Sequence, residues 1–241
     1  MIFSAGLKKA SNYIGELIYP KLCLHCGAEG EHDMDLCLRC YENLSWIKFA
    51  CQRCALQLKN DNAKICGACS KRKLSFEQAI APFLFEGFIR EAIYKFKFNQ
   101  KLNLGKLLAQ LLLRHIDTKD VEIPDVIVPV PLHKNRLRKR GYNQALEIAR
   151  IITKKLDCEL SYKSVFRNRD TSTQMELPAK HRHKNVMGAF SIKKEACELN
   201  NKHVCIIDDV MTTGNTVNEV AKCLRNAGAK RVDVWCVARV A

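Results

Sequence analysis

The chain has 241 residues, of which 47% are hydrophobic and 27% are charged, and its formal net charge is +15 at pH 7. That length accommodates one medium domain and a small appendage, and the ordinary composition excludes a wholly disordered chain. The positive charge favours a polyanionic partner because Lys and Arg side chains neutralise phosphates. A solvated basic face without a partner is the alternative.

Residues 1–20 carry apolar side chains at helical spacing and predict a helix packed on its own protein. Lys8, Lys9 and Glu16 interrupt these apolar residues. The segment therefore lacks both the apolar core of a signal peptide and the roughly 20 apolar residues of a membrane span. We predict a cytoplasmic protein without a membrane span. In that reducing compartment, the 13 cysteines favour metal ligation over disulfides.

Four C-x-x-C pairs lie within residues 21–74 and predict a small zinc-binding module. The predicted ligands are Cys23, Cys26, Cys37, Cys40, Cys51, Cys54, Cys66 and Cys69. Four thiolates satisfy tetrahedral Zn²⁺ and leave no open position, so we expect two structural zinc ions and no metal catalysis here. Sequential pairing gives a double zinc ribbon, and interleaved pairing is the alternative. The module has few large apolar residues, so metal should supply much of its folding free energy.

Residues 76–241 alternate apolar runs with amphipathic segments, which is typical of an α/β domain with a mostly parallel sheet. The predicted strands cover residues 79–85, 126–130, 204–208 and 232–237. The predicted helices cover residues 89–98, 104–116, 143–156 and 216–226. The chain is therefore predicted to comprise a helix over 1–20, the zinc-binding module over 21–74 and an α/β domain over 76–241.

The most informative stretch is residues 204–216, with the sequence VCIIDDVMTTGNT. Its four apolar residues predict a central strand, and Asp208 and Asp209 come at the carboxyl end, where ligands bind in open α/β sheets. The following turn, called the nest below, comprises Thr212, Thr213, Gly214, Asn215 and Thr216. Its backbone N–H groups at the start of a helix suit a phosphate dianion. The two carboxylates are then placed to accept hydrogen bonds from the hydroxyls of a ribose whose 5-phosphate occupies the nest.

A basic region follows the second predicted strand, where residues 128–144 read VPVPLHKNRLRKRGYNQ. Between residues 129 and 185 there are 14 Lys and Arg residues against 5 Asp and Glu residues. The positive charge is thus concentrated in the half of the chain that carries the nest. Residues 166–185 are polar and basic, with too few apolar side chains for an ordinary buried hairpin.

Residues 204–216 resemble the signature of type I phosphoribosyltransferases. The resemblance implies that fold, an α/β domain with a mostly parallel sheet flanked by helices, with Asp208 and Asp209 as catalytic-site residues. It implies a pyrophosphate-binding loop formed by Pro131, Leu132, His133, Lys134 and Arg140. It also implies a flexible hood that carries Gln174, Arg182 and Asn185. Phosphoribosyl pyrophosphate (PRPP) would bind with Mg²⁺ held through the two aspartates, and no general base is assigned.

The four C-x-x-C pairs, the basic run, the polar hood segment and the DDVMTTGNT motif together resemble the ComF family, whose ComFC-type members serve natural competence. The resemblance implies a zinc ribbon fused to a phosphoribosyltransferase domain that binds PRPP or ribose 5-phosphate. It also implies single-stranded DNA as a partner on the cytosolic side of DNA uptake, with competence helicases or recombination proteins as further partners. It supplies no acceptor substrate. A non-catalytic PRPP sensor and a zinc-dependent DNA-binding adaptor are the alternatives.

Overall fold

The computed structural model describes residues 21–31, 34–119, 121–170, 187–193 and 199–241. The chain divides into two compact units, Met1–Leu44 and Ser45–Ala241. The first four C-x-x-C cysteines belong to the first unit and the last four to the second. Within the described ranges, no helix is both long enough and apolar enough to cross a membrane.

The described part of the first unit has very little apolar core. Its described part consists of short bridged turns and the helix α2 (Leu38–Glu42). Its buried hydrophobic residues in the described ranges are Cys23, Met34, Leu36 and Leu44. An apolar core of that size cannot offset the conformational entropy lost on folding, so another source of stability is needed.

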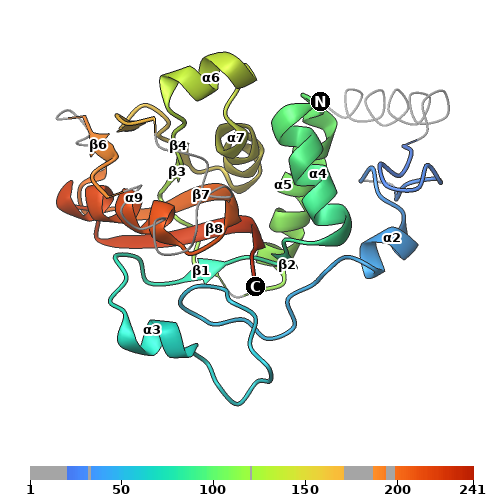
Figure 1. Cartoon of the computed structure of the whole chain (residues 1–241), viewed down its shortest axis with the longest axis horizontal. Helices are drawn as coiled ribbons and strands as arrows, with labels where there is room; N and C mark the ends of the chain where they lie inside the picture. Colours follow the sequence, from blue (N-terminus) through green and yellow to red (C-terminus); the bar gives the residue numbers. More distant parts are fainter. Residues whose placement is uncertain (1–20, 32–33, 120, 171–186, 194–198) are drawn as a thin grey trace, which may run out of the picture. The chain divides into compact units, whose positions relative to one another are not determined.

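The second unit is built on a parallel sheet (Figure 1). Its strands are β1 (Ala79–Ile80), β2 (Phe83–Leu84), β3 (Val126–Pro129), β4 (Glu159–Leu160), β7 (His203–Met211) and β8 (Arg231–Arg239). The order is β1-β8-β7-β3-β4, with β2 also paired to β8, and every pair is parallel. The central strands β3, β7 and β8 are apolar and buried on both faces, as parallel sheets require. The predicted α/β class is confirmed.

Helices cover both faces of this sheet. They are α4 (Gly87–Phe98), α5 (Leu102–Asp117), α6 (Lys134–Arg140), α7 (Gln144–Leu156) and α9 (Asn215–Asn226). α5 and α7 pack together and against the sheet, whereas α9 packs on β7 and β8 from the other side (Figure 1). α4 packs closely on α5 at Gly105, where a Cβ atom would lie 2.5 Å from the Phe96 ring. A further, short helix of the second unit, α3 (Gly67–Lys71), carries Cys69.

Three predicted elements differ from the structure. The strand predicted over 79–85 is two short strands, because Pro82 between them has no N–H to donate to a neighbouring strand. The strand predicted to end at Asp208 continues to Met211, so both aspartates lie inside β7 rather than beyond it. The basic run predicted as a loop forms α6, which places Lys134 and Arg140 at the two ends of a helix.

A separate two-stranded antiparallel ribbon joins β5 (Val165–Arg167) to β6 (Phe190–Ile192). Its base is attached to α9, where the backbone N–H of Gly188 donates to Glu219 Oε2 at 3.2 Å. The predicted hood residues Gln174, Arg182 and Asn185 lie outside the described residues.

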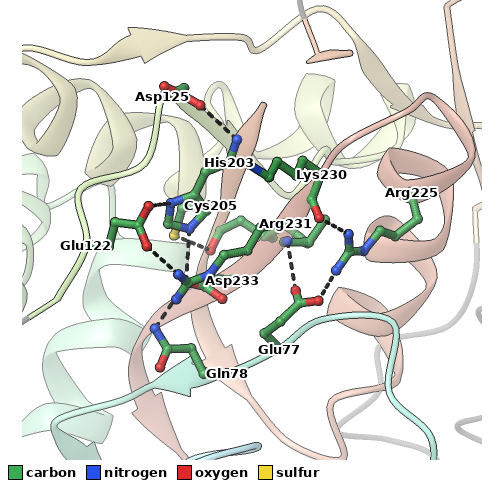
Figure 2. Close-up of polar contacts among 12 residues, drawn as sticks. Glu77, Gln78, Glu122, Asp125, His203, Cys205, Arg225, Lys230, Arg231 and Asp233 are labelled. Atoms are coloured by element: carbon green, nitrogen blue, oxygen red, sulfur yellow. Dashed lines mark hydrogen bonds and ion pairs between the residues drawn. The ribbon is translucent and has the colours of Figure 1, made fainter. Parts of the chain in front are cut away.

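A polar cluster occupies the amino ends of β7 and β8 (Figure 2). Asp233, which is 1% exposed, accepts from Gln78 Nε2 and lies 3.0 Å from His203 Nε2 and 2.8 Å from Arg231 Nη2. Glu77 is held in the same region, because its carboxylate accepts from the backbone N–H of Val232 at 2.9 Å. The segment that leads from the second cysteine group into β1 is thus fixed to β8.

Replacing Asp233 by Ala should lower the free energy of unfolding by about 3 kcal/mol, because Arg231 loses a buried partner. Urea unfolding would measure the loss. The control is the exposed Glu122, which also pairs with Arg231. Glu122→Gln should lower the free energy of unfolding by less than about 1 kcal/mol. Equal costs for the two variants would show that the buried carboxylate does not stabilise the cluster.

Candidate functional site

Two adjacent carboxylates form the centre of the site. Asp208 and Asp209 lie in the carboxyl half of β7, at the opposite end of the strand from His203. Asp209 is 5% exposed, and its backbone N–H donates to Asp208 Oδ1 at 2.9 Å. Burial and the neighbouring Asp209 charge raise the pKa of Asp208 to about 8. Two carboxylates held this close, with one pKa raised, are arranged to receive a cation or a hydroxyl-bearing ligand.

Lys97 completes the acidic centre and was missed by the sequence analysis. Its Nζ atom lies 2.6 Å from Asp209 Oδ2, and its side chain is 18% exposed. Lys97 stands on α4, more than 100 residues earlier in the chain than Asp209, so only the tertiary structure brings the two charges together. The alternation of basic and aromatic residues at the end of the predicted helix was the only local signal.

Replacing Lys97 by Met should lower the free energy of unfolding by about 3 kcal/mol in the absence of divalent cations, because Asp209 is left buried without its cation. Added Mg²⁺ should restore more stability in this variant than in the wild type. The control is Lys95→Met, whose cation pairs with Glu91 on the exposed side of α4. Indistinguishable unfolding curves for the two variants would contradict this role for Lys97.

The nest follows immediately after β7. The strand ends at Met211, residues 212–214 turn, and the 12-residue helix α9 begins at Asn215. Gly214 has φ +74°, a left-handed conformation that residues with a Cβ rarely adopt, and the nearest atom to an added Cβ is 3.5 Å away. The backbone conformation, not the available space, therefore requires glycine here. Thr213 Oγ1 is buried and has no hydrogen-bond partner in the described part of the chain, which fits a ligand acceptor at this turn.

A pocket at the carboxyl end of β7 is lined by arginine side chains as well as by the two aspartates. The pocket is lined by Arg136, Arg140 and Arg167 together with Asp208, Asp209, Thr212 and Thr216. Burial lowers the pKa of Arg140, and burial followed by the charge of Arg136 lowers that of Arg167 to about 10. Both guanidinium groups stay protonated at neutral pH. With Lys97, four cations face two aspartates, so the pocket carries excess positive charge that suits a polyanion.

Gln144 is a second residue that the sequence analysis did not assign to the site. Its side chain is 2% exposed and lines the pocket at the first turn of α7. Arg140 Nη1 donates to Gln144 Oε1 at 2.6 Å, and this contact orients the amide, whose Nε2 has no partner within normal hydrogen-bond geometry among the described residues. A buried, unpaired donor in a basic pocket is well placed to bind an oxygen of an anionic ligand.

The structure separates the residues of the predicted pyrophosphate loop. Leu132 and Arg140 line the pocket, whereas Lys134 is exposed and Pro131 is half-buried. His133 is buried and caps α6, because its Nδ1 accepts from the backbone N–H of Asn135 at 3.3 Å. Its side chain therefore has a structural role in this arrangement.

Asp170 attaches the base of the β5–β6 ribbon to α6. Asn135 Nδ2 donates to Asp170 Oδ2 at 3.1 Å, and Arg136 Nε lies 3.4 Å from Oδ1. The Asn135 hydrogen bond, followed by the Arg136 charge, lowers the pKa of Asp170. The end of β5 that leads toward the hood segment is thereby held near α6, and Arg167 of β5 lines the pocket.

The eight cysteines form two tetrads in sequential order. Cys23, Cys26, Cys37 and Cys40 form one, and Cys51, Cys54, Cys66 and Cys69 form the other, with the sulfur atoms of each within 4.8 Å of one another. Sulfur atoms are 3.7 Å apart in the pairs Cys26–Cys37 and Cys54–Cys66. Tetrahedral Zn–S bonds of about 2.3 Å place sulfur atoms about 3.8 Å apart, so both tetrads fit structural zinc. The sequential pairing is confirmed, and the interleaved alternative is wrong.

Comparison with known proteins identifies the family of the chain. A family model described as "Phosphoribosyl transferase domain" matches residues 98–241, and one described as "Double zinc ribbon domain" matches residues 14–70. Competence protein F of Haemophilus influenzae is 32% identical over 222 residues, which cover 90% of this chain and 96% of that protein. The chain belongs to the ComF family. The resemblance drawn from the sequence motifs is confirmed.

Other relatives of this ComF family member cover similar shares of the chain. DNA utilization protein YhgH of Escherichia coli is 30% identical over 208 residues, 85% of this chain and 90% of that protein. Competence protein ComFC of Bacillus subtilis is 23% identical over 240 residues, 90% of this chain and 94% of that protein. Among solved structures, glutamine PRPP amidotransferase from B. subtilis is 25% identical with a TM-score of 0.33. That match covers 56% of this chain and only 25% of the amidotransferase.

Proposed function

We propose that the pocket at the carboxyl end of β7 binds PRPP or ribose 5-phosphate together with Mg²⁺. The observation that carries the proposal is that one pocket is lined by the Asp208–Asp209 pair, by Thr212 and Thr216 of the nest, and by three arginines. We further propose that the functional division of the chain is a helix over residues 1–20, a zinc-ribbon module over 21–74 and a phosphoribosyltransferase-like domain over 76–241.

In this proposal each group of the ligand has a matching part of the site. The 5-phosphate occupies the nest, where backbone N–H groups and the start of α9 favour an anion. Asp208 and Asp209 accept hydrogen bonds from the ribose hydroxyls and are the residues that hold Mg²⁺. Arg140 and the other pocket arginines bind the pyrophosphate. Gln174, Arg182 and Asn185 of the hood, together with Pro131, Leu132 and His133 immediately before α6, are proposed to enclose it.

The same arrangement supports transfer of the phosphoribosyl group. As pyrophosphate leaves, positive charge develops at C1 of the ribose and negative charge on the leaving group. The pocket arginines are fixed in advance and stabilise the departing pyrophosphate, an effect worth a few kcal/mol for each well-placed donor. Mg²⁺, when bound, neutralises further charge on the same group. The non-catalytic alternative is a PRPP sensor that uses the same residues without turnover.

Calorimetric titration of the zinc-loaded protein tests the proposal, with PRPP and ribose 5-phosphate each titrated in the presence of Mg²⁺. Saturable binding of both ligands at one site per chain is expected. An assay for released pyrophosphate then separates an enzyme from a sensor. Failure of the wild-type protein to bind either ligand would leave the zinc-dependent DNA-binding adaptor as the proposed function.

We also propose that the protein handles single-stranded DNA in the cytosol during natural transformation, with competence helicases or recombination proteins as partners. Two relatives are named as competence proteins, and a third is named as a DNA utilization protein. The exposed side of α6 supports this proposal. Lys134, Arg138 and Lys139 are exposed, whereas Arg136 and Arg140 line the pocket on the other side of the helix. α6 therefore offers one basic side for a small anion and another for a nucleic-acid backbone.

Replacing Lys134, Arg138 and Lys139 together by Gln should reduce the salt dependence of single-stranded DNA binding. The slope of log affinity against log salt concentration should flatten by about 2, since each phosphate contact on a single strand contributes about 0.7. Fluorescence anisotropy at several salt concentrations would measure it. Lys154→Gln with Lys155→Gln, at exposed positions on α7, is the control for charge alone. Equal slopes in the two variants would exclude the exposed side of α6 as the DNA site.

A further inference from the structure

The second zinc tetrad lies in the same compact unit as the nest and is joined to it by an arginine. Arg239, the last residue of β8, is 7% exposed. Its Nε donates to the carbonyl of the zinc ligand Cys54 at 3.0 Å. Its Nη1 donates to the carbonyl of Met211 at 3.1 Å and also to that of Thr212. One planar guanidinium thus connects the first C-x-x-C pair of this tetrad to the point where β7 becomes the nest.

A second arginine makes the equivalent connection from the other C-x-x-C pair. Arg72 follows α3, the helix that carries Cys69. Its Nη2 donates to Asn215 Oδ1 at 2.7 Å, and its Nη1 lies 3.5 Å from the carbonyl of Thr213. Asn215 is buried and is the first residue of α9. Each half of the tetrad therefore holds a different part of the nest.

These contacts fix the direction in which the nest presents its donors. In a trans peptide the C=O and the following N–H point in opposite directions. When Arg239 and Arg72 engage the carbonyls of Thr212 and Thr213, the N–H groups of Thr213 and Gly214 are directed away from the two arginines. The carbonyl oxygens, which would repel a phosphate, accept hydrogen bonds from the two arginines on the side of the tetrad. The backbone N–H groups point to the opposite side.

Packing and a further hydrogen bond also connect the second tetrad to the nest and to the start of α9. Ala55, next to the ligand Cys54, is fully buried and belongs to the same hydrophobic cluster as Met211 and Val217. The backbone N–H of Ser75 donates at 2.8 Å to Asn218 Oδ1, on the first turn of α9. A shift of the tetrad would therefore be transmitted to the nest through both packing and hydrogen bonds.

We propose that the second zinc site positions the phosphate nest, so that zinc at Cys51, Cys54, Cys66 and Cys69 and a ribose phosphate at the nest stabilise each other through Arg72 and Arg239. The proposal rests on the proposed function for the identity of the ligand. Coupling between sites is reciprocal, so the ligand must slow zinc loss from this tetrad if zinc strengthens ligand binding. Arg72 and Arg239 are positioning residues, since neither lines the pocket. The first tetrad, in the other compact unit, serves as an internal reference.

Two measurements on the zinc-loaded protein test the coupling. The first is the affinity for ribose 5-phosphate of Arg72→Met, compared with Lys73→Met, which removes the same charge at the exposed neighbouring residue. Arg72→Met should bind about 10-fold more weakly, within the usual range of coupling between sites, and Lys73→Met should match the wild type. Arg239→Lys, which keeps the charge but loses the fork of donors, is a second variant. Far-ultraviolet circular dichroism confirms that each variant is folded.

The second measurement is the rate of zinc transfer to a chromogenic chelator. The Cys26→Ser variant, which lacks an intact first tetrad, identifies the kinetic phase that belongs to the second. Saturating ribose 5-phosphate should slow that phase about 10-fold in the wild type and much less in Arg72→Met, and should leave the first tetrad's phase unchanged. The coupling is overturned if the wild type binds ribose 5-phosphate but the ligand does not slow zinc loss and Arg72→Met binds it as tightly as the wild type. The proposed function then stands. If the wild type binds no ribose phosphate, both are overturned.

Discussion

Replacing Asp209 by Asn should weaken the binding of PRPP with Mg²⁺ by about 100-fold. The substitution keeps the shape of a side chain that is 5% exposed but removes the charge that attracts the cation and accepts from the ribose hydroxyls. Loss of a charged hydrogen-bonding partner costs up to about 3 kcal/mol, which corresponds to that factor. Isothermal calorimetry of the two proteins at the same Mg²⁺ concentration measures the effect.

The matched control is Asp117→Asn, which makes the same chemical change at an exposed residue at the end of α5. Its affinity should equal that of the wild type. Asp209→Asn also leaves Lys97 without its partner, so an affinity that rises on removing the carboxylate would mean that the lysine binds the phosphates directly. An affinity unchanged from the wild type would show that the acidic pair has no part in binding.

Loss of the first zinc site should unfold the first unit while the second keeps its fold. The described part of the first unit buries only four hydrophobic residues, one of which is the zinc ligand Cys23, and structural zinc contributes about 10 kcal/mol or more to folding. Cys37→Ser should therefore abolish hydrogen-exchange protection over residues 21–44. Mass spectrometry of peptides from this region provides the measurement.

Cys66→Ser is the matched variant at the second tetrad, whose neighbouring Ala55 packs into the core of the α/β unit. It should increase exchange in residues 51–69 and leave strands β3, β7 and β8 protected. Full protection of residues 21–44 in Cys37→Ser would contradict the account, because the small apolar core would then be sufficient without the tetrad.

The central strands and the long helices of the α/β domain were predictable because each carries its own local signal, whereas the short strands β4, β5 and β6 were not predicted. The four apolar residues before Asp208 form a strand buried on both faces, and the helices around them show one apolar side. Pro82 was a readable signal that the first strand is interrupted. The helix α6 also had local signals, since Gly141 with φ +84° ends it, but its basic composition was interpreted as a ligand-binding loop.

The rest of the site depends on contacts between distant parts of the chain. Lys97 and Asp209 are on separate elements, and no spacing rule relates them. The amide of Gln144 is oriented by Arg140, a contact that requires α6 and α7 to meet at Gly141. The link from Cys54 through Arg239 to Thr212 joins three segments and has no sequence pattern. Local patterns therefore predict the elements and the motifs, whereas the charge balance of the pocket is a tertiary property.

The central claim is that the nest holds the phosphate of a phosphoribosyl ligand, and the backbone amides of the nest report on it most directly. We would record amide ¹H–¹⁵N spectra of the zinc-loaded protein during titration with ribose 5-phosphate. The account predicts large, saturable shifts at Thr213, Gly214 and Asn215, with the amides of Lys154 and Lys155 on α7 unchanged. Shifts confined to the exposed side of α6, or no shifts at saturating ligand, would contradict it.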